Sequence, residues 1–234
     1  MRTWALSVGL SLWGCARVPV DPDVIPLDSL SETQRRQVEH IPADVAATAP
    51  LEAQDVRSRP EIYEFLLTEM PFTGGIVREL NRGKWEITRD PQDPRKEVFQ
   101  VLDPAGMRLR FELVLREPTR RFYVSTGRFS MRPLPPLEGS TLVVMRAEPA
   151  GGVLRTDATV YVRVETPFYA NMAKGVRGTV ESVVRERAGY FIRAARWVAE
   201  EAAARPEWLH LQVVGSAKVD QEVLEDFRKK FLAR

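Results

Sequence analysis

Hydrophobic and polar residues alternate along the middle of the chain with a period of two, which is typical of β-strands. From residue 107 to residue 116, every second position is a large apolar residue, and mostly arginine and glutamate stand between them. The same alternation recurs over residues 153–165, where alanine and valine occupy positions 158, 160, 162 and 164. Such a pattern predicts strands with one buried face and one face toward water.

Together with four further strand-like segments, these two give six expected strands separated by turns or short connections, which predicts an antiparallel meander. The expected strands are residues 84–88, 97–102, 107–116, 122–129, 141–148 and 153–165. Asp103-Pro104-Ala105-Gly106 has proline second and glycine fourth, a combination that favours a tight turn. Ala150-Gly151-Gly152 is expected to close the last hairpin, and residues 133–139 to form a longer connection.

The segments on both sides of the meander have helical periodicity. Residues 60–70 and 76–80 predict two short helices separated by Pro71. After the last strand, Thr166-Pro167 resembles the start of a helix that continues to Ala204 with one apolar stripe. A long amphipathic helix must bury its stripe, and the apolar face of the meander is the available partner. The sequence therefore predicts an α+β fold, an antiparallel six- to seven-stranded curved sheet packed on a long C-terminal helix.

The N-terminus has the features of an export signal. Arg2 precedes a ten-residue apolar segment, residues 4–13, which is too short to span a bilayer comfortably. Leu12-Trp13-Gly14-Cys15 resembles the lipobox of bacterial lipoproteins, although Trp13 departs from the usual small residue. The resemblance implies removal of residues 1–14 and a membrane anchor on acylated Cys15, in the bacterial envelope and facing the periplasm. The alternative is a buried cysteine in an apolar helix. Ala16 after the cysteine favours the outer membrane over the inner.

The remaining chain divides into three parts by composition. Residues 15–55 contain repeated prolines and are expected to form a tether, with one short helix over residues 32–40 because Ser31 and Gln34 match a capping box. Residues 56–205 are expected to form one domain. Residues 206–234 form a C-terminal extension that we expect to be helical, with apolar positions suited to a helix over residues 220–232.

Charge and chemistry exclude several functional classes. The chain has 34 basic and 32 acidic residues, mixed along its length, which argues against a nucleic-acid partner. Its two histidines, His40 and His210, are far apart, and no pattern predicts a metal site, a phosphate loop or a nucleophile elbow. We therefore expect no cofactor and no enzymatic activity.

The order of elements resembles the helix-grip superfamily, also called START-like or SRPBCC. The resemblance covers residues 45–205 and rests on topology, chiefly on the hairpin and long helix of residues 141–204. The first strand of that superfamily precedes the short helices, and here only residues 44–55, with Pro50, correspond to it. The resemblance implies a cavity between sheet and helix, which in many members holds a sterol, a fatty acid or a polyketide.

Eight residues are candidates for lining this cavity; in a solid core the apolar ones would instead pack together. Arg187 either binds an acidic ligand head or lays its stem on the core and sends its head to water. A lipid-anchored periplasmic protein that binds or carries a hydrophobic ligand is the leading interpretation. The alternative is an envelope-assembly lipoprotein with a protein partner and no ligand, and a third reading is a cyclase-type enzyme. The eight residues are Phe111, Leu113, Tyr123, Val160, Val162, Val176, Val180 and Arg187.

Overall fold

The computed structural model describes residues 25–93, 95, 97–104, 106–131, 134–165, 170, 175 and 177–232. The expected signal peptide, Cys15 and Val176 lie outside these residues. Within the described part of the chain, no helix is both long enough and apolar enough to cross a bilayer.

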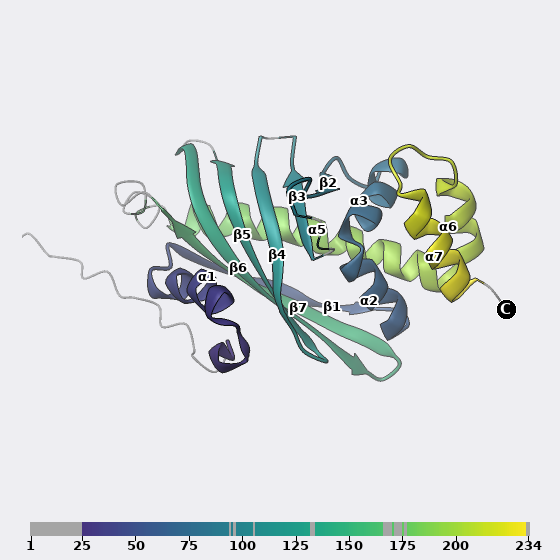
Figure 1. The fold of residues 1–234 in the computed structure, drawn as a ribbon, viewed down its shortest axis with the longest axis horizontal. Coiled ribbons are helices and arrows are strands. Elements are labelled where there is room, and N and C mark those ends of the chain that lie inside the picture. The colour runs from purple at the N-terminus through teal and green to yellow at the C-terminus, as the bar shows by residue number, and fades with distance from the viewer. Residues whose placement is uncertain are drawn as a thin grey trace, which may run out of the picture.

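One open sheet of seven antiparallel strands forms the centre of the protein (Figure 1). Its strand order is β1-β7-β6-β5-β4-β3-β2, so β2 to β7 form the meander that the alternating pattern predicts. The expected connection at residues 133–139 is instead mostly strand, because Leu137 pairs with Phe129 and is buried. The strands are β1 (Ala47–Val56), β2 (Glu86–Arg89), β3 (Val98–Leu102), β4 (Arg108–Arg116), β5 (Arg120–Met131), β6 (Leu134–Ala150) and β7 (Val153–Val164).

Strand β1 comes from the segment that we expected to end the tether. It pairs with β7 from Ala47 opposite Val162 to Val56 opposite Leu154, with a register shift between Leu51 and Gln54. Pro50 is tolerated because β1 is an edge strand, where a missing N–H need not interrupt the sheet. The tether expected over residues 15–55 therefore does not reach residue 55, and the sheet has the first strand of the helix-grip arrangement.

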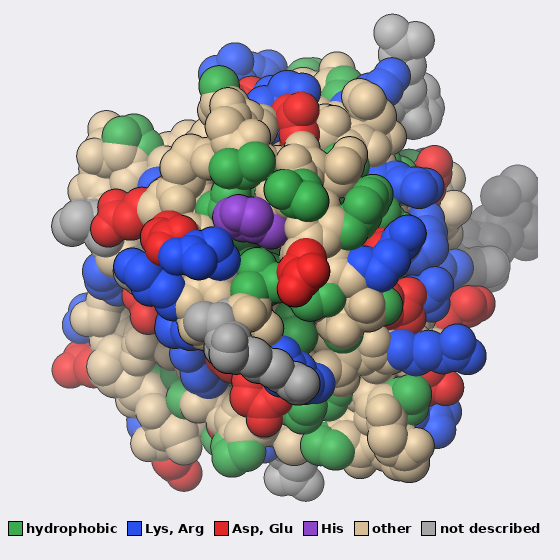
Figure 2. Space-filling view, turned by 90° about the vertical axis from the view of Figure 1, so that its right-hand side faces the viewer, with side chains coloured by type: hydrophobic (Ala, Val, Ile, Leu, Met, Phe, Trp, Pro, Cys, Tyr) green, Lys and Arg blue, Asp and Glu red, His purple; other side chains and the backbone are tan. Residues whose placement is uncertain are grey.

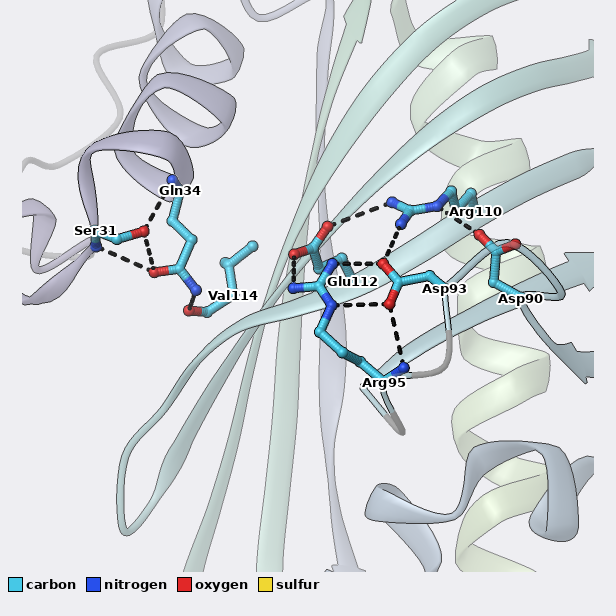
Figure 3. A network of polar contacts seen from close by, with 8 residues as sticks. All are labelled: Ser31, Gln34, Asp90, Asp93, Arg95, Arg110, Glu112 and Val114. Atoms are coloured by element: carbon cyan, nitrogen blue, oxygen red, sulfur yellow. Dashed lines mark hydrogen bonds and ion pairs between the residues drawn. The ribbon is translucent and has the colours of Figure 1, made fainter.

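Helix α1 (Glu32–Ala43) covers the outer face of the sheet. Its capping box is confirmed: the Gln34 N–H donates to Ser31 Oγ at 3.3 Å, and the Ser31 N–H donates to Gln34 Oε1 at 3.1 Å. The Gln34 amide also donates to the Val114 carbonyl at 2.8 Å and so joins the helix to β4 (Figure 3). Val38 and Ile41 are fully buried against strand residues such as Phe122. The outer face, expected to be wet, is thus partly a second core, and a single 3-10 turn (Leu27–Ser29) precedes α1.

Three helices cover the inner face: α2 (Pro60–Thr68), α3 (Met70–Glu79) and the long α5 (Arg177–Ala204). Figure 1 shows α5 running behind the strands, as the amphipathic stripe predicts. Its buried residues, among them Val180 and Val198, belong to the main core with the inner face of the sheet. Pro71 does not separate two helices as expected; it lies in the first turn of α3, where its missing N–H costs nothing.

The C-terminal extension is helical and is part of the main core. It forms α6 (Pro206–Val213) and α7 (Gln221–Phe231), and Asp220 caps α7 by accepting from the Glu222 and Val223 N–H groups at 3.0 and 3.2 Å. The ring of Phe227 lies 5.8 Å from that of Phe65 in α2. Figure 2 views the molecule from this end and shows hydrophobic side chains interrupted by charged ones.

Candidate ligand cavity between the sheet and helix α5

A cavity of about 140 Å³ lies between the inner face of the sheet and α5. Strands β1 and β3 to β7 line one side, α5 lines the other, and α2, α3 and Trp85 contribute at the edge. The cavity is partly open to solvent, and its surface is almost wholly apolar. An apolar cavity of about 150 Å³ is large enough to bind benzene, whereas sites for drug-sized ligands are about 300–1,000 Å³.

Small residues are part of the cavity lining on both the sheet and the helix. Ala158 of β7, with Ala188 and Ala195 of α5, leaves room that larger side chains would fill. Large rings stand at the walls and pack against each other. Phe99 and Phe111 are stacked with ring centroids 5.4 Å apart, and Trp85 and Phe191 are stacked at the same separation. Because the two rings of each pair pack against each other, they contribute to the wall of the cavity.

Four of the eight candidate residues line this cavity: Phe111, Tyr123, Val160 and Arg187. The other three that the structure describes, Leu113, Val162 and Val180, pack in the main core without reaching the cavity.

Sequence reasoning did not select Val183, Val184, Ala188 and Phe191, the residues by which α5 contributes much of its lining. The apolar stripe of the helix includes most of them. Its period gives the buried face of the helix but not which turn lies opposite the middle of the sheet.

Tyr123 lines the cavity, but the surface that it presents there belongs to its ring and not to its hydroxyl. The hydroxyl is inaccessible and has no hydrogen-bond partner among the described residues. Burial raises the pKa of Tyr123 to about 12, so the phenol is neutral at physiological pH. Burial also raises the pKa of the neighbouring Tyr63 and lowers that of Arg121, whose guanidinium pairs with Glu64. Tyr63, Arg121 and Glu64 are not among the lining residues, so this polar cluster lies outside the cavity.

Among the described residues that line the cavity, Arg187 alone is charged. Its Nη1 lies 3.2 Å from Asp103 Oδ2 in the turn between β3 and β4, and its Nη2 donates to the Ser130 carbonyl at 2.9 Å. The Arg187 side chain is 24% exposed and that of Asp103 is 4% exposed, which places the ion pair at the rim. Arg187 therefore lines the cavity at its rim without sending its head freely to water, because Asp103 and the Ser130 carbonyl hold the guanidinium.

A second polar cluster lies on the outer face of the sheet (Figure 3). Arg110 Nε donates to Asp90 at 2.6 Å, and both Arg110 and Arg95 reach Asp93 and Glu112 at 2.6–3.3 Å. The hydrogen bond from Arg95 is the main cause that lowers the pKa of Asp93 to about 2. These contacts attach the segment between β2 and β3 to β4.

No group of three or more His, Cys, Asp or Glu side chains in the described part of the chain is placed to hold a metal ion. His40 lies in α1 and His210 in α6, on separate parts of the structure.

Comparison with known proteins gives structural similarity only. No protein-family model matches the chain, and no curated protein is similar to it in sequence. Among solved structures, Ara h 8.0201 is 14% identical, with 65% of this chain and 96% of that chain covered and a TM-score of 0.42. TTHA0849 from Thermus thermophilus is 13% identical, with 67% and 99% covered and a TM-score of 0.42. Protein CV1439 from Chromobacterium violaceum is 14% identical, with 59% and 96% covered and a TM-score of 0.34.

Proposed function

We propose that this protein is a lipid-anchored binder or carrier of a hydrophobic small molecule in the bacterial periplasm, and that it is not an enzyme. The observation that carries the proposal is the apolar cavity of about 140 Å³ between the sheet and α5. Well-packed interiors contain few voids larger than a water molecule, and an apolar cavity of this size offers water few hydrogen-bond partners, so an apolar ligand can replace water there favourably. The cavity therefore favours ligand binding over the alternative of an assembly lipoprotein with a solid core.

The anchor is supported by Leu12-Trp13-Gly14-Cys15 at the end of an apolar segment. Nine residues lie between Cys15 and Ile25, the first residue that the structure describes, so the ten steps of chain limit their separation to about 35 Å. A ligand-binding domain held so close to a bilayer can exchange apolar molecules with it. Ala16, the residue after Cys15, favours anchoring in the outer membrane over anchoring in the inner membrane.

Ligand binding is tested on the whole chain purified from membranes in detergent. Native mass spectrometry should detect a co-purified apolar molecule, or either cumene or a dansylated fatty acid should bind saturably at one site per chain. Absence of all three signals would reject the proposed function.

The anchor has an independent test. Globomycin, which blocks lipoprotein signal cleavage, should leave a heavier precursor in cells, and Cys15→Ser, which lacks the thiol to be acylated, should leave an unprocessed precursor whether or not globomycin is present. An unchanged mass in the presence of globomycin would reject the anchor and leave the ligand-binding proposal standing.

A further inference from the structure

We infer that the ligand is a small amphiphile, with an apolar part about the size of one aromatic ring inside the cavity and a neutral hydrogen-bond acceptor at Arg187. This inference rests on the proposed function and adds the chemical class of the ligand. It follows from three properties of the cavity: its volume, the lack of accessible polar atoms in its interior, and the ion pair at its rim.

The volume limits the size of the apolar part. About 140 Å³ is close to the cavity size that accommodates benzene and well below the sites that hold drug-sized molecules. The stacked pairs Phe99–Phe111 and Trp85–Phe191 form part of the wall, so a sterol or a long acyl chain would have to separate packed rings. A single ring or a short branched chain enters without that cost.

Among the described residues, the interior presents almost no polar surface to a ligand. The Tyr123 hydroxyl is inaccessible, and the buried Thr141 hydroxyl shares a hydrogen bond with Ser125 Oγ at 2.6 Å. A ligand oxygen placed there would lose its hydrogen bonds to water without replacement, which is unfavourable. The polar part of the ligand must therefore stay at the opening.

Arg187 is the residue that can donate a hydrogen bond to the polar part of the ligand at the opening. A guanidinium has five N–H donors, and the contacts with Asp103, Ser130 and Met107 engage only its two terminal nitrogens. Asp103 already balances the positive charge, and its carboxylate is 3.2 Å from Nη1. A ligand carboxylate bound to the same guanidinium would lie beside that buried negative charge. A ketone, ether or hydroxyl oxygen can accept from Arg187 without this repulsion.

Cumene, acetophenone and benzoate separate these contributions, because they share one ring and differ in the group attached to it. Their dissociation constants are measured by ligand-observed NMR titration on the wild type, on Asp103→Asn, and on the double variant Arg187→Met with Asp103→Asn. The double variant removes both charges together, so it does not leave a buried carboxylate without its partner. Asparagine keeps the side-chain oxygen that accepts from the Met107 N–H at 2.8 Å.

We expect the wild type to bind acetophenone more tightly than benzoate. In the double variant, affinity for acetophenone should fall about threefold to tenfold relative to cumene, as for loss of one net hydrogen bond, while cumene binding stays within about twofold. Asp103→Asn alone should raise the affinity for benzoate about tenfold relative to acetophenone, because one negative charge at the rim is removed.

Each contrary result has a distinct meaning. An unchanged acetophenone-to-cumene ratio in the double variant overturns the role of Arg187, and tighter wild-type binding of benzoate overturns the neutral head. A sterol or palmitate that binds more tightly than acetophenone overturns the size limit. In all three cases a hydrophobic ligand still binds, so the proposed function stands. If cumene, acetophenone and the dansylated fatty acid all fail to bind, the proposed function itself is rejected.

Discussion

Filling the cavity from the helix side should raise stability and abolish binding at the same time. Ala188 is half-buried on α5 and lines the cavity. Ala188→Leu adds three carbons, and at about 0.8 kcal/mol for each buried methylene group the gain has a ceiling of about 2.4 kcal/mol. Helix propensity changes little between alanine and leucine. For a domain of this size, about 2–4 °C in Tm accompanies each kcal/mol, so Tm should rise by up to about 10 °C.

Binding should move in the opposite direction. The added carbons occupy space that the ligand needs, and loss of two buried methylene contacts alone weakens binding by more than about tenfold. Calorimetric unfolding gives the stability change, and NMR titration with cumene gives the affinity. Ala204→Leu is the matched control, because Ala204 is exposed at the end of the same helix. That variant should stay within about 0.5 kcal/mol of the wild type and keep its affinity.

The reasoning is refuted if Ala188→Leu is less stable than the wild type. Extra methylene groups forced into a filled core cost about 1–3 kcal/mol, so destabilisation would mean that no usable space exists beside α5. A stabilised variant that still binds cumene as tightly as the wild type would instead show that the ligand occupies another place.

The remaining predictions concern packing and pH. Gly75→Ala should destabilise the protein by about 1–3 kcal/mol, because the added Cβ would lie 2.2 Å from the Lys218 carbonyl oxygen. Gly178→Ala should stabilise it by about 0.5–1 kcal/mol, because an added Cβ there has no atom within 4 Å. Urea unfolding of both variants measures the two changes. The pKa of Asp93 is lowered to about 2, so its contribution to the free energy of unfolding is present above about pH 4 and is lost as pH falls toward 2. In an acid-unfolding experiment, the stability of Asp93→Asn should therefore depend less on pH in that range than the stability of the wild type. The pKa of Tyr123 is raised to about 12, so its contribution to the free energy of unfolding is present below about pH 10 and is lost between pH 10 and 12. The alkaline unfolding curve of Tyr123→Phe should therefore be less steep in that range than that of the wild type. An equally steep curve would contradict the burial of Tyr123.

Local patterns in the sequence determined most of the secondary structure. The period of two predicted β4 and β7, strand-like segments between turns predicted β2, β3, β5 and the later part of β6, and the helical stripe predicted α5 up to its end at Ala204. Capping residues predicted α1 through Ser31, and the apolar positions of residues 220–232 predicted α7. These features could be read from the chain because they act between residues only two to four positions apart.

Tertiary structure alone decided the features that bring distant segments together. Residues 47–56 are a strand because β7 pairs with them, and the outer face is covered because α1 packs there, although neither segment has a strong signal for its partner. Because of where α5 lies along the sheet, Ala188 lines the cavity and Val180 does not. Likewise, the pairing of Arg187 with Asp103 joins residues far apart in the chain. Periodicity gives the buried face of each element, but the offset between two packed elements depends on how all their side chains fit together, and that offset decides where the cavity lies.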